Sequence, residues 1–511
     1  MIHDGSTFDT PLELDADLCV IGSGAGGATA AMVAAEAGLR VVVLEAGAFV
    51  DPSRMTQREE QMLPQLYWEA GGRSSADRAV RIHQGRGVGG STLHNLNLCK
   101  RVPAPLLAAW HRDRDLGDLT PQAWSALYDE VEALIEVSDV PRDKWNRHNQ
   151  LLEAGATRLG WRGGGLRHNR SGCVGSGFCE IGCAYDAKNN ACKVMVPRIV
   201  RAGGEILAHT QAVRVLHEGG AVTGVEAVTL DAQTHRPLVR VVVHAPRVCL
   251  AASATASAAL WLRSGLPAPE GSVGDTLRIH PAVVVAGDFD EPVHAWRGIP
   301  QTYEVSEFLD LDPSHAAGDK ARSLWIIPVF GHPMGTSTML PGYGAAHAGM
   351  MARYAHLAVF GAMLHDSTEG RVRPRGELGL SIDYVLNEAD RRELALGVAA
   401  CAKLQFAAGA RRVLVPTAQL VELSSAAECD ALASLPITPG SIDVTAVHPM
   451  GSIPMGGDAA VAAVDSHGAA HQTRGLWVSD ASLFVTSIGG PPQLSVYALG
   501  LRVGRAIVAR G

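Results

Sequence analysis

The sequence predicts an α/β fold that contains a Rossmann-type domain, and three observations support this prediction. The apolar run DLCVI (17–21) leads directly into GSGAGG, which contains the glycine spacing G-x-G-x-x-G. Residues 28–37 are small and favour a helix, and the apolar run 40–45 is a second strand that ends in Glu45. This order of strand, glycine turn, helix, strand and acid is typical of a nucleotide-binding βαβ unit.

Each part of this unit has a chemical purpose. Gly22, Gly24 and Gly27 let the backbone come close to a pyrophosphate, and the helix that follows offers N–H groups and the positive end of its dipole. Glu45 lies about twenty residues further on, where an acid accepts a hydrogen bond from a ribose hydroxyl. The alternative is a tight turn between strand and helix that binds no ligand.

The composition excludes some classes of protein. With 511 residues the chain is long enough for two closely joined domains. Its formal net charge of -8, without a basic block, argues against nucleic acid as a partner. The first residues lack the basic and apolar segments of an export signal, and no apolar run is long enough to span a bilayer. We therefore expect a soluble cytoplasmic protein without a transmembrane segment.

A second glycine-rich loop, GRGVGGSTLHN, covers residues 85–95. Such a loop presents backbone N–H groups and small side chains, which suit close contact with a phosphate or a flat ring. A surface turn is the alternative interpretation. Because the loop lies within one nucleotide-fold length of the first motif, we expect both loops to contact the same ligand.

The sequence further divides into three regions. Residues 1–280 form the nucleotide-binding domain, with a covering segment at about 100–196 and an apolar strand at 241–250. Residues 281–415 contain longer segments with scattered aromatic side chains, and we expect them to form a substrate-binding cap. Residues 416–511 return to the nucleotide-binding domain.

The helix near the end of the expected cap has clear boundaries. Asn387 precedes the helical segment and is a favoured N-cap, and Gly409 follows it at the position where glycine commonly ends a helix. The sequence therefore predicts one long helix between these two residues.

Two further motifs stand near the C-terminus. The segment HPMGS (448–452) is predicted to form a loop. The segment GLWVSD (475–480) is predicted to form a strand that ends in an acid, Asp480. With both glycine loops in this order and at these separations, the sequence resembles the glucose-methanol-choline (GMC) oxidoreductase family from about Asp15 to the C-terminus. The resemblance implies FAD in the Rossmann-type domain and a cap of mostly antiparallel sheet plus helices on the substrate side.

The resemblance also implies which residues contact the cofactor. Glu45 would contact the adenosine ribose, Val213 the adenine, and Asp480 the ribityl chain or the pyrophosphate. The full set of expected FAD-binding residues is Gly22, Gly24, Ala25, Glu45, Arg86, Gly90, Ser91, His94, Asn95, Val213, Asp480, Ala481, Pro492 and Gln493.

His94 raises a separate question about the cofactor. In some members of the family a histidine at this place is bonded covalently to the flavin, whereas many others carry an aliphatic residue. A neutral imidazole nitrogen is a nucleophile near neutral pH, so such a bond is chemically reasonable. The alternative is a histidine that only forms hydrogen bonds near the cofactor.

His448 is the candidate catalytic residue. Alcohol oxidation by a flavin needs a base for the hydroxyl proton while the carbinol hydride moves to flavin N5, and histidine suits this role near pH 7. Family members usually place a second His or Asn about forty residues later, but here that position is Pro491, which has no side-chain donor. His448 therefore acts alone, or a cap residue replaces the partner, or the reaction differs.

Four cysteines crowd into one block: Cys173, Cys179, Cys183 and Cys192. A comparable block in a few family dehydrogenases holds an iron-sulfur cluster. The spacing matches neither ferredoxins nor the paired C-x2-C of zinc sites. We favour a turn with buried thiols or one local disulfide, and we expect no metal.

The leading functional hypothesis is an FAD-dependent alcohol oxidase or dehydrogenase. O2 or another electron acceptor would reoxidise the flavin, and the apolar cap favours an apolar alcohol over a sugar. The absent partner at Pro491 motivates a second hypothesis, a flavin-dependent lyase or decarboxylase on the same fold. A third is a flavin-binding protein without turnover. The sequence does not indicate an oligomeric state.

Overall fold

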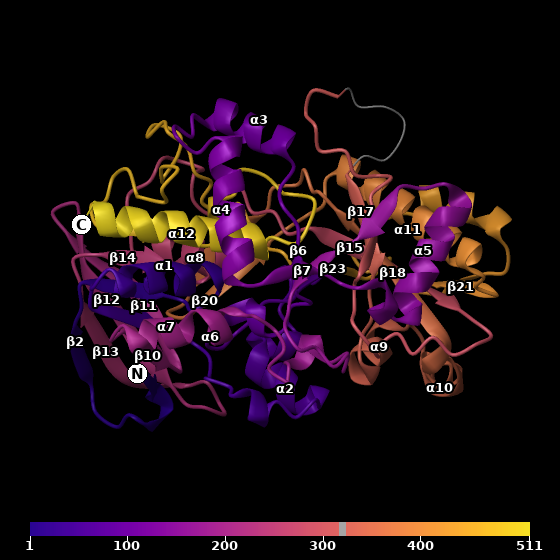
Figure 1. The fold of residues 1–511 in the computed structure, drawn as a ribbon, viewed down its shortest axis with the longest axis horizontal. Helices are drawn as coiled ribbons and strands as arrows, with labels where there is room; N and C mark the ends of the chain where they lie inside the picture. Colours follow the sequence, from indigo (N-terminus) through magenta and orange to yellow (C-terminus); the bar gives the residue numbers. More distant parts are fainter. Residues whose placement is uncertain (316–322, 511) are drawn as a thin grey trace.

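A six-stranded parallel sheet lies in the half of the molecule that holds both chain ends (Figure 1). The computed structural model describes residues 1–315 and 323–510. In spatial order the strands of this sheet are β1 (Ile2–Asp4), β10 (Glu205–Ala208), β4 (Val41–Leu44), β3 (Leu18–Ile21), β14 (Val248–Leu250) and β24 (Leu476–Val478).

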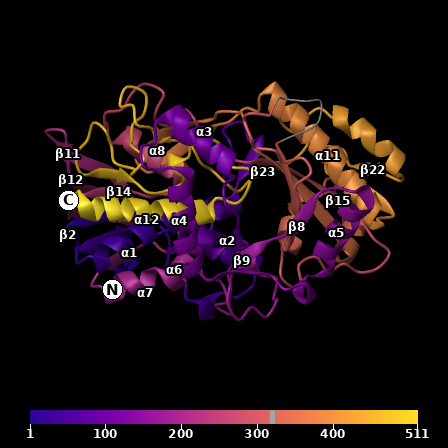
Figure 2. The ribbon, with the colours of Figure 1, turned by 45° about the horizontal axis from the view of Figure 1, so that its top comes forward.

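The predicted βαβ unit forms the middle of this sheet. β3 and β4 are buried along their whole length and pair in parallel, with Ile21 opposite Leu44. The helix α1 (Ala25–Glu36) begins just after the glycine turn, and the C-terminal helix α12 (Gln493–Ala509) packs along it (Figure 2). Because parallel strands end at the same edge, the glycine turn and Glu45 emerge side by side.

A four-stranded sheet lies in the same half of the molecule (Figure 1). It contains β11 (Thr210–Glu218), β12 (Ala221–Leu230), β13 (Pro237–His244) and β2 (Leu12–Asp15), in this order. The single strand expected at 241–250 is wrong. Pro246, which has no N–H group to continue a ladder, lies between two separate strands, so β13 joins this sheet and β14 joins the parallel sheet.

A nine-stranded, mostly antiparallel sheet forms the other half of the molecule (Figure 1). Its main path runs β22 (Val421–Leu423), β21 (Arg412–Val415), β15 (Pro281–Asp288), β18 (Leu357–Leu364), β17 (Leu324–Pro328), β16 (Tyr303–Val305) and β8 (Gly163–Gly165). The strand β23 (Val444–Ala446) pairs with β15 and with β5 (Val80–Ile82). The sheet therefore draws strands from outside the expected cap, 281–415, and residues 316–322 of that cap lie outside the described residues.

One face of this sheet is covered by the long helix α11 (Glu388–Ala408). Its boundaries are confirmed, because the Asn387 side chain accepts from the N–H of Asp390 and Gly409 adopts a left-handed conformation. Gly397 of the helix lies against Ala362 of β18, and Gln405 lies against Gly287 of β15. Since side chains alternate along a strand, the residues between these positions face the opposite side.

The remaining elements surround these sheets. The other helices are α2 (Glu59–Leu66), α3 (Ala104–Arg114), α4 (Pro121–Leu134), α5 (Arg147–Leu159), α6 (Ala191–Val194), α7 (Val196–Arg201), α8 (Ser253–Arg263), α9 (Pro333–Met339) and α10 (Gly344–Ala352). Two small sheets are formed by β6 (Leu98–Cys99), β9 (Arg167–Asn169) and β7 (Val137–Asp139), and by β19 (Arg371–Arg375) and β20 (Gly379–Asp383).

Candidate active site

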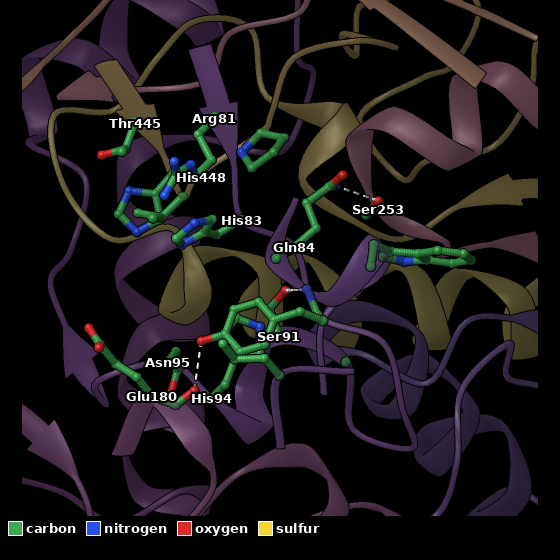
Figure 3. A pocket seen from close by; sticks show the side chains of 18 of the residues that line it. Arg81, His83, Gln84, Ser91, His94, Asn95, Glu180, Ser253, Thr445 and His448 are labelled. Carbon is green, nitrogen blue, oxygen red and sulfur yellow. Dashed lines mark hydrogen bonds between the residues drawn. The ribbon is translucent and has the colours of Figure 1, made fainter. Parts of the chain in front are cut away.

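One large cavity, of about 1140 Å³, runs from the glycine turn of the parallel sheet to the open face of the antiparallel sheet. His448, His83 and residues of the second glycine loop all extend into it (Figure 3). The expected site residues that line this cavity are Gly22, Gly24, Ala25, Glu45, Gly90, Ser91, His94, Asn95, His448, Asp480, Ala481, Pro492 and Gln493. Tertiary folding therefore brings most of the candidate residues to a single place.

Two expected cofactor ligands do not line the cavity. Arg86 is buried beside it, where its guanidinium donates to the carbonyl of Ala46 and lies 4.8 Å from the Trp68 ring centroid. Val213 is buried next to Ala212, which does line the cavity, at the point where the register of β11 shifts. For these two residues the expected contact with FAD stays a prediction.

Glu45 ties the two glycine loops together. Its Oε2 accepts from the N–H and the hydroxyl of Ser23 in the first loop, at 3.1 and 2.7 Å. Its Oε1 accepts from the N–H groups of Gly47 and Gly87, at 3.0 and 3.3 Å. The carboxylate thus holds the first loop against the second in addition to facing the cavity.

The two loops touch through glycine. A Cβ atom at Gly90 would stand only 2.8 Å from the Cα of Gly24, and Gly90 has a φ of +56°, which glycine adopts without strain. Gly22, Gly24 and Gly90 all line the cavity, and they carry no side chain that would cover their backbone. This is the arrangement that a pyrophosphate requires, since it needs backbone N–H groups without side chains in the way.

Asn95 and Gln493 connect the second loop to the start of α12. The Asn95 side-chain amide donates to Oε1 of Gln493 at 2.7 Å, and Gln493 in turn donates to the carbonyl of Leu98 at 2.6 Å. Both residues line the cavity. Their mutual hydrogen bond fixes the position of the loop end against the C-terminal helix.

Asp480 is buried and lies two residues after the end of β24, slightly beyond the strand end that the sequence predicted. Its Oδ2 accepts from the N–H of Ser253 at 3.0 Å and from the hydroxyl of Ser257 at 2.5 Å, and its Oδ1 accepts from the N–H of Ser482 at 2.8 Å. Burial raises the pKa of this carboxyl above its ordinary value. The hydrogen bonds orient the carboxyl at the cavity wall, where α8 begins.

His94 stands at the end of the second loop with a free nitrogen. Its ring packs on Tyr67 with 3.9 Å between centroids, and its Nε2 is buried without a hydrogen-bond partner among the described residues. Burial, together with the nearby charge of Lys188, holds its pKa well below the ordinary value. The ring is therefore neutral and offers an unpaired nitrogen beside the expected position of the flavin.

His448 follows β23 and lines the cavity, and burial lowers its pKa to about 3. Pro491 also lines the cavity but offers no donor, as the sequence predicted. A residue that sequence reasoning missed, His280, lies behind His448 with 3.2 Å between the two Nδ1 atoms. As one of twenty histidines it belongs to no recognisable motif, and the only signal was its place directly before an apolar strand.

His83 and Glu180 are two further cavity residues that the sequence did not single out (Figure 3). Burial lowers the pKa of His83 to about 4, and burial raises the pKa of Glu180 to about 8, with the charge of Glu59 adding to the effect. At neutral pH His83 is therefore neutral and Glu180 is largely protonated.

The cysteine block braces the second glycine loop. All nine cysteines are free thiols, so the block forms no disulfide. The buried ammonium of Lys188 donates to the carbonyls of Leu93, Asn95 and Cys179, at 2.8, 2.5 and 3.2 Å. Within residues 1–315 and 323–510 no group of three or more His, Cys, Asp or Glu is arranged to hold a metal ion.

The fold and this site define a dinucleotide-binding protein, with two glycine loops that would hold the cofactor and a histidine in the same cavity. Comparison with known proteins identifies the family. The GMC oxidoreductase models match residues 63–282 and 366–500, and an FAD binding domain model matches residues 17–51. The chain belongs to the GMC oxidoreductase family and binds FAD.

Similar proteins cover nearly the whole chain. An uncharacterized GMC-type oxidoreductase of Mycobacterium tuberculosis strain H37Rv is 35% identical over 98% of this chain and 77% of its own length. A long-chain-alcohol oxidase of Arabidopsis thaliana is 25% identical over 97% of this chain and 69% of its own length.

Solved structures share the fold. The chain superposes on pyridoxine 4-oxidase from Mesorbium loti with a TM-score of 0.69 and 20% identity, covering 96% of this chain and 98% of that one. For formate oxidase of Aspergillus oryzae the TM-score is 0.71 at 14% identity, with 97% and 98% covered. At these identities the likeness shows the fold alone. In the part of the chain that is described, no helix is long and apolar enough to cross a membrane.

Proposed function

We propose that this protein oxidises an apolar alcohol to an aldehyde or ketone, with FAD accepting the electrons and O2 or another acceptor reoxidising it. The observation that carries this proposal is the composition of the cavity wall opposite the cofactor loops. When bound, FAD supplies the hydride acceptor. The residues of this chain bind the cofactor, shape the substrate space and contact the hydroxyl group.

The wall consists of alternate residues from adjacent strands. Side chains at even positions of β15 and at odd positions of β17 and β18 line the cavity, while their neighbours face α11. The lining side chains of these three strands are Ala282, Val284, Ala286, Trp325, Ile327, Leu357, Val359 and Met363. Since all are apolar apart from the Trp325 N–H, which donates to Glu304, the wall favours an apolar chain or ring over a sugar.

His448 is the residue we propose to contact the alcohol hydroxyl. It lines the same cavity as the wall and the cofactor loops, whereas Pro491, which also lines this cavity, cannot form the contact through its side chain. Burial keeps His448 neutral at pH 7, so it meets the substrate as an uncharged imidazole. The 25% identity to an Arabidopsis long-chain-alcohol oxidase agrees with an apolar alcohol.

The proposal is tested by mixing the purified flavoprotein anaerobically with primary alcohols of increasing chain length, sterols, aromatic alcohols and sugars. We expect bleaching of the flavin band by an apolar alcohol, with one aldehyde or ketone formed per flavin reduced. Product formation without any bleaching would instead indicate the lyase hypothesis. Absence of bleaching with every alcohol tested would refute the proposed oxidation.

A further inference from the structure

His280 and His448 meet at the end of one strand pairing. His280 directly precedes β15 and His448 follows β23, and these two strands are antiparallel, with Pro281 opposite Ala446. The Nδ1 atoms of the two rings are 3.2 Å apart, and the rings are nearly perpendicular, at 82°. His448 lines the cavity, whereas His280 is fully buried behind it.

The other ring nitrogen of His280 is occupied by two donors. Its Nε2 accepts from the backbone N–H groups of Ile488 and Gly489, at 3.2 and 3.1 Å. A nitrogen that accepts hydrogen bonds carries a lone pair and no proton, so a neutral imidazole in this position has its proton on Nδ1. Burial and the neighbouring His448 keep the pKa of His280 well below its ordinary value, so the ring is neutral.

The two backbone amides therefore decide the tautomer of both rings. The Nδ1–H of His280 points at Nδ1 of His448, which must accept and hence carries no proton. The proton of a neutral His448 then sits on Nε2, its remaining nitrogen. The opposite arrangement would place an N–H of His280 against two backbone N–H groups and leave both unpaired.

We propose that His280 is a positioning residue that holds His448 in its Nε2–H tautomer, so that His448 offers a hydrogen-bond donor to the hydroxyl oxygen of the substrate. The substrate part of this inference rests on the proposed alcohol oxidation. The donor takes the place of the side chain that Pro491 lacks. In the Nε2–H tautomer His448 cannot also accept the hydroxyl proton, so that proton passes to another group in the cavity, for which the neutral imidazole of His83 is available.

A buried carboxylate holds the segments around His280 in place. Asp366 accepts from the backbone N–H groups of Ile279 and His280, and from the hydroxyls of Tyr384 and Ser487. The backbone of His280 and, through Ser487, the loop that binds its Nε2 are thus hydrogen-bonded to the same carboxylate. His365 and Arg278 are the other titratable side chains near His280 and Asp366.

The tautomer can be observed directly, without substrate. The holoenzyme is labelled with [15N]histidine, and long-range 1H–15N correlation spectra distinguish Nδ1–H from Nε2–H imidazole. The signals of His448 and His280 are assigned by their loss in His448→Gln and His280→Gln. We expect His448 as Nε2–H and His280 as Nδ1–H at pH 7. A spectrum with His448 as Nδ1–H, or His280 as Nε2–H, would overturn the proposal whether or not any variant folds.

Two substitutions at position 280 separate positioning from packing. In His280→Asn the side-chain amide lies where Nδ1 was and can still donate to His448, whereas His280→Gln places its amide where Nε2 was and retains only that end. We expect His280→Asn to keep the Nε2–H tautomer of His448. We expect His280→Gln to lose the tautomer and to slow flavin reduction by about a hundredfold with FAD still bound.

The outcomes separate the two proposals. If both variants bind FAD and reduce equally well with His448 unchanged, His280 has no positioning role. If the tautomers are as expected but no alcohol bleaches the flavin, the proposed function fails and the tautomer assignment stands.

Discussion

The Cα of Gly26 on α1 lies so close to the backbone carbonyl of Ser479 that a Cβ at this position would stand 1.8 Å from its oxygen. Gly24, two residues earlier, has space on the protein side, with only the Cα of Gly90 within 4 Å of a Cβ. Gly26 therefore lets α1 pack closely against the segment of Ser479. Gly24 leaves the cavity beside it free of a side chain.

This difference predicts two distinct phenotypes. In Gly26→Ala the added methyl group clashes with the Ser479 carbonyl directly after β24 and pushes α1 away from it. This should destabilise the protein by about 3 kcal/mol or more. Gly24→Ala should keep the thermal stability of the apoprotein but lose bound FAD, because its methyl group occupies the pyrophosphate site. Thermal unfolding of the apoproteins and the flavin absorbance after purification measure the two effects. Loss of stability in both variants alike would contradict this division.

His448→Ala should remain yellow but lose reduction by alcohol. Removing a single hydrogen-bonding group at the reacting oxygen typically slows the reaction by about 10²–10³-fold. Stopped-flow absorbance under anaerobic conditions measures the rate of flavin bleaching. The control is His217→Ala, which removes an exposed histidine on β11. A rate equal to that of the wild type in His448→Ala would exclude this residue from the reaction.

The unpaired Nε2 of His94 predicts a covalent link to the flavin. Acid precipitation of the wild-type protein should leave the yellow colour in the pellet, because a covalent bond survives unfolding. His94→Ala should release all colour into the supernatant while still binding FAD when folded. Colour in the supernatant of the wild-type protein would show that His94 only packs beside the cofactor.

The alternation along β15 predicts opposite effects at neighbouring positions. Val284 faces the cavity, whereas Val283 is fully buried on the side of α11. Val283→Thr buries an unpaired hydroxyl and should cost about 1–3 kcal/mol of stability. Val284→Thr should leave the stability nearly unchanged and raise the KM for an apolar alcohol roughly fivefold, which corresponds to ~1 kcal/mol. Thermal unfolding and initial rates of both variants test this pair; a reversed pattern would contradict the assigned faces.

Glu180 predicts a change of stability with pH. Its folded-state pKa of about 8 lies above that of an unfolded glutamate, so its stabilising contribution is complete below about pH 4.5 and is lost as the pH rises through 8. The Tm of the wild type should therefore fall relative to that of Glu180→Gln between pH 5 and pH 9. The exposed Glu377→Gln is the control. A constant difference in Tm across this range would show that Glu180 is ionised throughout.

Local patterns were sufficient for the cofactor side of the molecule. The glycine turn after β3, the acid after β4 and the capped helix α11 were all read from neighbouring residues, because each depends on local backbone geometry. The strand expected at 241–250 failed for a local reason that was visible, namely Pro246. Arg86 and Val213 do not line the cavity, because a place in a motif does not fix the direction of a side chain.

By itself the sequence indicated an FAD-binding GMC oxidoreductase, which the family models confirm, and it places Pro491 where members of the family usually carry a His or Asn partner for His448. Only the tertiary structure decided what lies behind His448. His280 is 168 residues away in the sequence and reaches it through the pairing of β15 with β23. Two amides of a third segment then decide where its proton resides. Such a contact has no local signal, since three separate segments must fold together before it exists.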